Sequence, residues 1–326
     1  MRRLLLALLP LWGCAAPTLV DADLVALTAL ANEVDGDSLM ATVTAFSNAH
    51  LADTPIDCAQ LGNVTERFCH LTRETSRDLM RSRFEALGYT VTTQVTEDGL
   101  LSTTNLIAEK TGTTRPDEII LIGAHFDAFY GGADDNSSGV AAVLELARLF
   151  STRSFDRTVR FVGFDLEEMG LVGSTRYVGS VASNEPIVAS IAFDCIGFTH
   201  PTQSSLPGLP SPKEGNFLAV IANGLSEPRA QQTRLLNDAL GGLVPLVGII
   251  APADGASPIA GNLMRSDHAP FWLAGREALF FTDTANFRNP NYHQQSDLPE
   301  TLDPEFLRSN VRLAAATAAY FAGGPR

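Results

Sequence analysis

The sequence has little positive charge. Only 23 of its 326 residues are lysine or arginine, against 37 aspartates and glutamates, which gives a formal net charge of -14. It contains no basic block that could follow a phosphate backbone, so we expect no nucleic-acid partner.

Cysteines are also few. The four in the chain form no CxxC pair and no Cys/His cluster, which argues against a thiolate zinc site.

Long apolar runs are missing as well, except for a short one at the N-terminus. Two arginines precede the run from Leu4 to Leu9, which is too short to span a bilayer. A charged region followed by such a run is typical of an export signal. We therefore predict a signal peptide over residues 1–13.

The end of this signal, Leu11-Trp12-Gly13-Cys14, resembles a bacterial lipobox. This motif favours lipidation of Cys14. We expect a short tether over residues 14–20 and a single catalytic domain over residues 21–326. The expected location is then the periplasm, the outer membrane or the cell surface, with membrane attachment only through Cys14. The alternative is an ordinary signal peptide cut near Ala15 or Ala16, which would give a secreted protein.

Three cysteines remain in the exported chain. Cys58 and Cys69 flank a short polar stretch, and in an oxidising compartment this arrangement predicts a local disulfide. Cys195 lies inside an apolar run, where we expect a buried small hydrophobic residue rather than a nucleophile.

Apolar runs of strand length alternate with amphipathic runs of helix length. This pattern predicts an α/β domain with a mainly parallel, mixed central sheet and helices on both faces. The clearest strands cover residues 118–124, 158–165, 187–194 and 278–283, and the clearest helices begin at a cap on Ser76, cover 140–150 and cover 307–321. A loop rich in Pro, Ser and Gly over residues 201–215 is expected at the surface near the site.

Polar side chains follow the predicted strands. His125-Phe126-Asp127 comes after the first strand, Glu167-Glu168 after the second, and Asp194 ends the third. Ligands of open α/β sheets bind outside the carboxyl ends of the strands, so these groups should converge. A loop with Asp134 and Asp135, and a later loop with Tyr292-His293, add further donors.

Histidines and carboxylates without cysteines are the ligands of a catalytic zinc or a similar hydrolytic metal, and there are enough here for two ions. Two adjacent metals can share a bridging carboxylate and polarise a carbonyl. A further carboxylate must then move protons, and Glu167 with Glu168 suits that division of roles.

The motifs GAHFDA, GADDNSSG, DLEEMGLVGS, AFDCIG, SDHAPF and NYHQQSD resemble, in this order, the co-catalytic zinc aminopeptidases of metallopeptidase family 28. The resemblance spans roughly residues 105–300 and implies a zinc-dependent exopeptidase fold with two zinc ions. It implies that His125 and Asp194 hold one ion, that Glu168 and His293 hold the other, and that Asp135 bridges both.

Further roles follow from the same resemblance. Glu167 would be the general base for a metal-bound hydroxide, Asp127 would orient His125, and Tyr292 would stabilise the oxyanion. The peptide bond Asp135-Asn136 would be cis. Relatives commonly have an aromatic residue and Ala before the two glutamates, where this chain has Asp165-Leu166. This departure leaves both glutamates in place.

Other polar residues have simpler interpretations. Asp134 can serve only to favour a helix N-terminus. His268 is expected to support packing, and His50, His70 and His200 to be structural or at the surface. The sequons at Asn63 and Asn136 are not expected to carry glycans.

The expected function is an aminopeptidase that acts on peptide substrates with two zinc ions, although manganese or cobalt could replace zinc. A preference for hydrophobic N-terminal residues is implied by the family alone. Three alternatives stay open: a carboxypeptidase or dipeptidase with the same metals, a glutaminyl cyclase with one zinc, and a binding ectodomain without catalysis. The sequence leaves the oligomeric state open.

Overall fold

The computed structural model of the chain describes residues 18–20, 22–61, 65–98, 101–180, 184–204, 212–252 and 258–325. The predicted signal peptide, Cys14 and most of the tether lie outside the described residues, as do Asn63 and part of the 201–215 loop. Within the described ranges, no helix combines the length and the apolar composition needed to cross a membrane.

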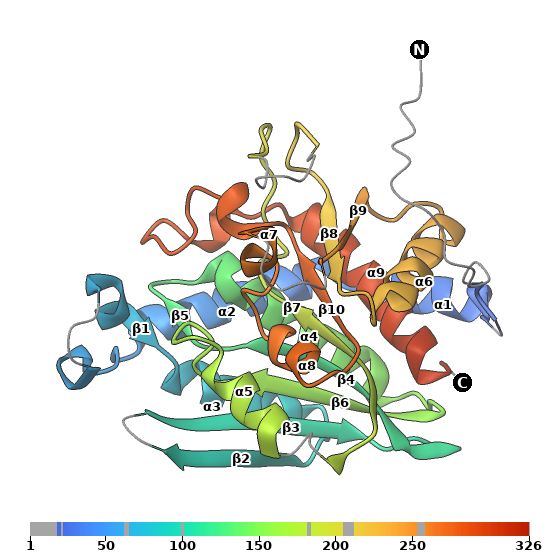
Figure 1. Cartoon of the computed structure of the whole chain (residues 1–326), viewed down its shortest axis with the longest axis horizontal. Helices are drawn as coiled ribbons and strands as arrows, with labels where there is room; N and C mark the ends of the chain where they lie inside the picture. The colour runs from blue at the N-terminus through green and yellow to red at the C-terminus, as the bar shows by residue number, and fades with distance from the viewer. Residues whose placement is uncertain are drawn as a thin grey trace.

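An eight-stranded mixed sheet occupies the centre of the molecule. Its strands lie in the order β2 (Val91–Asp98), β3 (Leu101–Lys110), β6 (Arg157–Phe164), β4 (Arg115–His125), β7 (Ile187–Phe193), β10 (Ala278–Thr282), β8 (Leu218–Ala222) and β9 (Leu246–Ile250), from the bottom of Figure 1 to the top. The inner strand β4 runs parallel to both neighbours, β6 and β7, and β10 runs parallel to β7. The pairs β2/β3, β3/β6 and β8/β10 are antiparallel, and β8/β9 is parallel.

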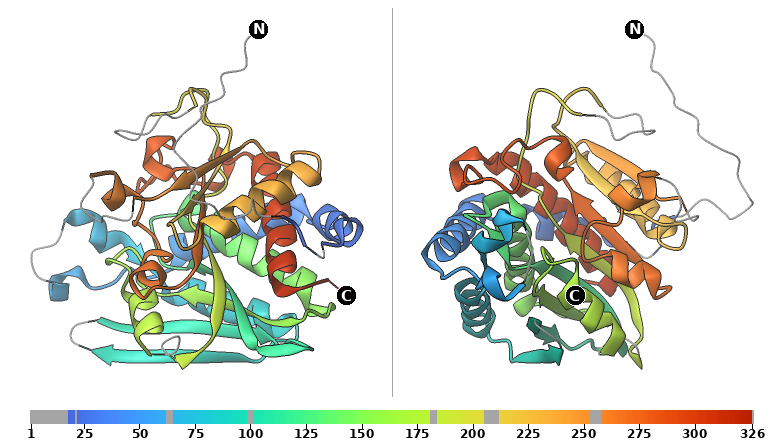
Figure 2. Two further views of the ribbon diagram at one scale, coloured as in Figure 1. Left: turned by 45° about the vertical axis from the view of Figure 1, so that its right-hand side comes forward. Right: turned by 60° about the vertical axis from the view of Figure 1, so that its left-hand side comes forward.

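Helices cover both faces of this sheet. One face packs against α1 (Leu24–Asn32), α2 (Gly36–Ala52), α3 (Glu74–Ala86), α4 (Gly139–Ser151), α6 (Glu227–Ala239) and α9 (Pro304–Ala322). The other face packs against α5 (Val172–Ser180) and α8 (Ala269–Leu273), with α7 (Pro258–Asn262) nearby. The right panel of Figure 2 separates the blue helices from the orange α8.

Successive side chains of a strand point to opposite faces of the sheet, so the strands contribute to two apolar cores, one on each face. In β4, Ile120 and Ile122 join the larger core, whereas Ile119 and Leu121 join the core under α5 and α8. Because both faces are apolar, the inner strands read as continuous hydrophobic runs, as in sheets covered on both sides. The predicted fold class is confirmed.

The predicted elements are found with small shifts. The four strands appear as β4, β6, β7 and β10, and the last helix begins earlier than predicted, where Asp303 accepts hydrogen bonds from the backbone N–H groups of Glu305 and Phe306. The cap on Ser76 is wrong. Helix α3 begins at Glu74, and the buried Ser76 hydroxyl instead donates to the carbonyl oxygen of Phe126 at 2.7 Å.

The predictions for Cys58, Cys69 and Cys195 are confirmed. Cys58 and Cys69 form a disulfide, and Cys195 is free and buried. The disulfide lies in a segment that leads through η2 (Glu66–His70) to the short strand β1 (Leu71–Thr72). This strand pairs with β5 (Ala128–Phe129), just after the end of β4. The disulfide segment is therefore attached next to the carboxyl edge of the sheet.

Candidate metal centre and active site

The polar side chains predicted to converge come from the carboxyl ends of three adjacent strands. His125 is the last residue of β4, Glu167 and Glu168 lie in the turn after β6, and Asp194 follows β7. Asp135 lies in the one-turn segment η3 (Ala133–Ser138) that leads into α4. His293 reaches the same place from the loop after η5 (Ala285–Phe287).

In the part of the chain that the structure describes, three overlapping groups of possible ligands form there; one consists of Asp135, Asp194 and Cys195, and the other two each contain a histidine. Ligand atoms of His125, Glu167 and Asp194 lie within 4.8 Å of one another, and so do those of Asp135, Glu168 and His293. Asp135 joins the groups: its Oδ1 lies 3.4 Å from His125 Nε2, and its Oδ2 lies 3.0 Å from His293 Nε2. The five predicted ligands and the predicted base are thus brought together.

The donor atoms of this cluster fit zinc. His125 Nε2, His293 Nε2, Asp135 Oδ2 and Glu168 Oε1 are buried and have no hydrogen-bond partner. His293 Nε2 comes within 3.0 Å of carboxylate oxygens of Asp135 and Glu168 without hydrogen-bond geometry. Buried polar atoms without partners are costly, and cations would satisfy all four. Imidazole nitrogens with carboxylate oxygens are a donor set that zinc accepts.

Burial and mutual charge shift the pKa values of the cluster. Burial, together with the neighbouring Asp135, raises the pKa of Glu168 to about 8, and burial raises the pKa of Glu167 well above its usual range. Burial alone would lower the pKa of His293, but the negative carboxylates of Asp135 and Glu168, which face its ring, raise it to about 10. Strongly shifted pKa values in a cluster of this kind mark a candidate functional site.

Asp127 holds the two glutamates as well as the first histidine. Its carboxylate accepts hydrogen bonds from the backbone N–H groups of Glu167 and Glu168 at 3.0 and 3.2 Å. His125 Nδ1 lies 3.0 Å from the backbone carbonyl oxygen of Asp127 and 3.6 Å from its carboxylate. The contact that orients the ring toward the cluster therefore runs mainly through the carbonyl group.

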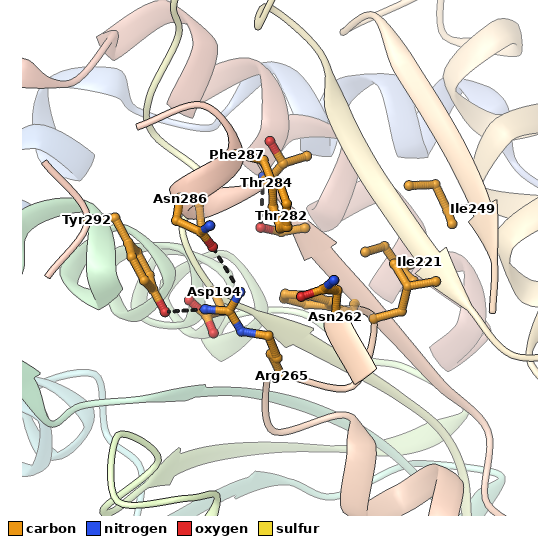
Figure 3. A pocket seen from close by; sticks show the side chains of 13 residues that line it. Asp194, Ile221, Ile249, Asn262, Arg265, Thr282, Thr284, Asn286, Phe287 and Tyr292 are labelled. Atoms are coloured by element: carbon orange, nitrogen blue, oxygen red, sulfur yellow. Dashed lines mark hydrogen bonds between the residues drawn. The ribbon is translucent and has the colours of Figure 1, made fainter. Parts of the chain in front are cut away.

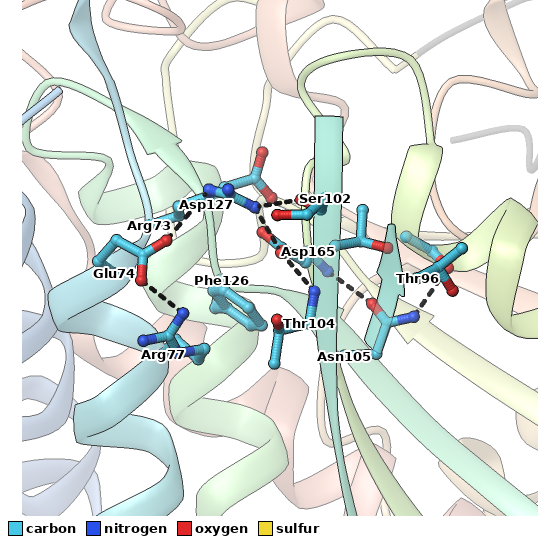
Figure 4. A network of polar contacts seen from close by, with 12 residues as sticks. Arg73, Glu74, Arg77, Thr96, Ser102, Thr104, Asn105, Phe126, Asp127 and Asp165 are labelled. Carbon is cyan, nitrogen blue, oxygen red and sulfur yellow. Dashed lines mark hydrogen bonds and ion pairs between the residues drawn. The ribbon is translucent and has the colours of Figure 1, made fainter. Parts of the chain in front are cut away.

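The turn before Glu167 is anchored by the network shown in Figure 4. Asp165 Oδ2 accepts hydrogen bonds from the guanidinium of Arg73 at 2.7 Å and from the backbone N–H of Thr104 at 2.8 Å. The backbone N–H of Asp165 donates to Asn105 Oδ1 at 2.9 Å. These contacts fix the turn from the side of β3 and α3.

Leu166, the departure from the family pattern, has a positive φ of 54° and is fully buried. It packs in a small apolar cluster with Leu71 of β1 and Phe129 of β5. The larger side chain is therefore accommodated by the segment next to the disulfide, which thereby supports the turn that carries both glutamates.

Two residues that support Asp135 were not predicted. The carboxylate of Asp297 accepts hydrogen bonds from the backbone N–H groups of Asp134 and Asp135 at 3.0 and 3.1 Å. Asn136 Nδ2 donates to the carbonyl oxygen of Phe193 at 2.8 Å. The Asp135-Asn136 peptide bond is cis, as the resemblance implies. The acidic residue four positions after His293 was the available signal for Asp297.

Asp134 does more than favour a helix N-terminus. Its carboxylate accepts hydrogen bonds from the backbone N–H of Gly197 and from Asn289 Nδ2, both at 2.9 Å. It thus ties the loop before α4 to the loop that carries His293.

An apolar pocket opens beside the cluster (Figure 3). Tyr292 stands at its edge, with its ring stacked on His293 at a centroid distance of 3.7 Å. The hydroxyl of Tyr292 lies 3.2 Å from the guanidinium of Arg265. The lining residues are Asp194, Ile221, Ile249, Asn262, Leu263, Arg265, Phe280, Thr282, Thr284, Ala285, Asn286, Phe287 and Tyr292.

The remaining histidines lie outside these groups of ligands. His268 is buried, stacks on Phe280 at a centroid distance of 4.4 Å and has its Nε2 2.8 Å from the carbonyl oxygen of Leu263, as expected for a packing residue. His50 contacts Thr72, His70 stacks on Tyr130, and His200 contacts Thr202.

The sequence is similar to those of known peptidases. A sequence model described as peptidase family M28 matches residues 105–318. The probable lipoprotein aminopeptidase LpqL of Mycobacterium tuberculosis (strain ATCC 25618 / H37Rv) is 31% identical over 246 residues, which cover 68% of this chain and 46% of the relative. The chain spans about two fifths to two thirds of the length of the first curated relatives that it matches.

Solved structures agree with the fold. An aminopeptidase from Aneurinibacillus sp. strain AM-1 superposes with a TM-score of 0.67 at 17% identity, covering 92% of this chain and 97% of that one. BSAP, a zinc aminopeptidase from Bacillus subtilis, superposes with a TM-score of 0.54 at 25% identity, covering 68% of this chain and 50% of that one.

Proposed function

Since this chain belongs to peptidase family M28, whose model matches residues 105–318, we propose that it is a metallo-aminopeptidase that removes N-terminal residues from peptides. The observation that carries the proposal is the pair of ligand groups joined by Asp135, whose two carboxylate oxygens face the two imidazoles separately. Two adjacent hydrolytic metals can share a single bridging carboxylate placed in this way.

In this proposal, His125 and Asp194 hold one zinc ion, Glu168 and His293 hold the second, and Asp135 holds both. When bound, the two ions supply Lewis-acid polarisation of the scissile carbonyl group and lower the pKa of water at the site. The buried donor atoms without hydrogen-bond partners support this assignment, because they otherwise carry an uncompensated desolvation cost.

Glu167 is the proposed general base. Its backbone N–H is fixed by Asp127 at 3.0 Å, and burial raises the pKa of its carboxyl group well above the usual range. A carboxyl group with a raised pKa can take a proton from the attacking water and return it to the leaving amine near neutral pH. The hydroxyl of Tyr292 donates to the oxygen on which negative charge develops.

Two parts of the substrate orient it. Acidic side chains attract its free ammonium group, and an apolar pocket accepts its first side chain. The carboxylates of Glu167 and Asp194 attract the free ammonium group of the peptide. The pocket beside Tyr292 accepts the first side chain, and its apolar walls, which include Ile221, Ile249 and Phe280, favour an apolar residue there. This pocket gives the hydrophobic preference implied by the family a physical basis in this chain.

We also propose that the protein is exported and anchored through a lipid on Cys14, and that the mature catalytic domain begins near residue 21. The disulfide between Cys58 and Cys69 supports export, since such bonds persist in oxidising compartments. The lipoprotein named among the relatives supports the anchor. Metabolic labelling with a fatty acid, compared between wild type and Cys14→Ala, tests it: the label should be lost in the variant.

The proposed activity is tested with leucine anilide and its N-acetylated form. The purified protein should cleave only the free-amine substrate, a zinc chelator should abolish cleavage, and added zinc should restore it. Glu167→Gln should keep its zinc and lose on the order of 10³-fold in kcat. A zinc-loaded protein that cleaves neither substrate would favour another exopeptidase specificity, and a protein that binds no metal would favour a binding ectodomain.

A further inference from the structure

The disulfide segment brings an arginine to the edge of the metal cluster. Arg67 lies in η2, two residues before Cys69, and its Nη1 is 3.3 Å from Nδ1 of His293. The two residues are 226 positions apart in the sequence. Figure 1 shows β1, which follows this segment, paired with β5 at the left of the molecule, away from β8 and β9.

Arg67 contacts two aromatic rings. Its guanidinium lies over the rings of Phe68 and Phe129, at 5.1 and 5.6 Å from their centroids. Phe129 in turn packs edge-on against the ring of His293 at a centroid distance of 4.9 Å. The disulfide and the β1/β5 pair hold the backbone on both sides. Arg67 is thus an exposed cation held by aromatic rings rather than by a carboxylate.

Among the described residues, no carboxylate lies within ion-pair distance of Arg67, whereas the nearby Arg73 and Arg77 are paired with Asp165 and Glu74. His293 offers Arg67 only a weak partner. Its Nε2 faces Asp135 and Glu168, and if Nε2 is the metal ligand, a neutral imidazole carries its proton on Nδ1. Nδ1 is then a donor and cannot accept from Arg67, so the exposed N–H groups of Arg67 are available to an acceptor on a ligand.

The direction in which a bound peptide runs across the site indicates which group of the substrate can be that acceptor. The apolar pocket for the first side chain begins at Tyr292 and Asp194, and Arg67 approaches His293 from the side of Phe129. A peptide whose first residue fills the pocket places its scissile bond over the cluster and its next residue toward Phe129. Since an extended residue spans at most about 3.6 Å, Arg67 is within reach of the first or second residue after the scissile bond.

We propose that Arg67 binds the C-terminal α-carboxylate of dipeptides and tripeptides, which makes short peptides with a free C-terminus the preferred substrates. This inference rests on the proposed function. The planar guanidinium can bind a carboxylate through two parallel hydrogen bonds. It also offsets the repulsion that the acidic cluster exerts on an incoming carboxylate. Long peptides and C-terminal amides present no carboxylate at this distance, so they lose this contact.

The test compares leucylglycine with leucylglycine amide, which differ only in the C-terminal group. Wild type should hydrolyse the free acid with a kcat/KM at least 10-fold above that of the amide. Arg67→Gln should remove most of this preference, mainly by raising KM for the free acid, and Arg67→Lys should restore part of it. Arg83→Gln, an exposed change on α3, is the matched control and should keep the full preference.

Zinc content should be equal in all four proteins, which separates loss of carboxylate binding from damage to the metal site. The proposal is overturned if wild type does not prefer the free acid, or if Arg67→Gln keeps the wild-type preference, while leucine anilide is still cleaved. If the zinc-loaded wild type cleaves neither the anilide, the dipeptide nor the amide, the proposed aminopeptidase function fails, and the assignment of Arg67 fails with it.

Discussion

Asp297 Oδ2 accepts a hydrogen bond of 3.1 Å from the backbone N–H of Asp135, although the two residues lie 162 positions apart. The other oxygen of the same carboxylate accepts from the backbone N–H of Asp134. Asp297 is 1% exposed, so both bonds are shielded from water. The residue that joins the two ligand groups is thus held in place by a carboxylate from the loop that also carries His293.

Replacing this carboxylate by an amide should weaken the metal site without unfolding the chain. Asp297→Asn puts an NH₂ group opposite one of the two N–H donors, so one hydrogen bond is lost. Loss of a group that orients a metal ligand typically costs about 10- to 100-fold in metal affinity or activity. Zinc titration against a fluorescent chelator should show this loss, and the exposed change Asp238→Asn on α6 should not. Equal zinc affinity and equal kcat in wild type and Asp297→Asn would contradict the role.

Tyr292→Phe should separate catalysis from metal binding. The phenyl ring can keep the stacking on His293, whose centroid lies 3.7 Å away, so the zinc content should stay the same. The hydroxyl is lost, and with it the proposed donor to the oxyanion, which should lower kcat on the order of 10²-fold with little change in KM. A kcat close to wild type would show that another group stabilises the oxyanion.

The apolar pocket predicts a change in side-chain preference. Ile249 lines the pocket, so Ile249→Trp should fill it and lower kcat/KM for leucine anilide relative to alanine anilide by roughly 10-fold or more. Ile250, the next residue of β9, lies on the opposite face of the strand beside α6, and Ile250→Trp is the matched control. An unchanged ratio of leucine to alanine hydrolysis in Ile249→Trp would mean that the first side chain binds elsewhere.

The sequence was sufficient to predict the inner part of the fold. Strands β4, β6, β7 and β10 are buried over most of their length, so their sequences are rich in apolar residues and easily recognised, although β6 also contains the buried Arg160. The edge of the sheet was harder to predict. β2 reads Val-Thr-Thr-Gln-Val-Thr-Glu-Asp and is largely polar, because an edge strand needs little apolar surface.

The site residues also fall into those that the sequence predicts and those that it does not. His125, Glu167, Glu168 and Asp194 lie at strand ends, where a general rule for parallel sheets brings them together. The position of Arg67 depends on a contact between segments 226 residues apart in the sequence, which no local pattern encodes. Asp297 contacts a residue 162 positions away, and its place four residues after His293 was the one signal for it. The Ser76 cap was wrong for a related reason: its hydroxyl donates to the carbonyl oxygens of Phe126, fifty positions away, and of Arg73, whereas a capping side chain accepts from backbone N–H groups.

His50 should make the stability of the fold depend on pH below neutrality. Its ring is buried on α2 with Nδ1 2.9 Å from the hydroxyl of Thr72, and burial lowers its pKa from 6.5 to about 4, against the opposing charges of Asp127 and Asp53. Between these two pH values the unfolded chain binds a proton at His50 that the folded chain does not. The free energy of unfolding therefore falls as pH falls from 6.5 to 4, by about 3 kcal/mol from this residue.

The comparison of wild type with His50→Asn isolates this contribution. The asparagine amide can occupy the place of Nδ1 next to Thr72 but does not titrate. The metal ligands are the same in both proteins, so their response to acid cancels in the difference. Urea unfolding at pH 7, 5.5 and 4.5 should show that wild type loses stability more steeply than the variant, with the gap closing toward low pH. Parallel stability curves would mean that His50 already carries a proton in the folded protein above pH 6, which its burial should prevent.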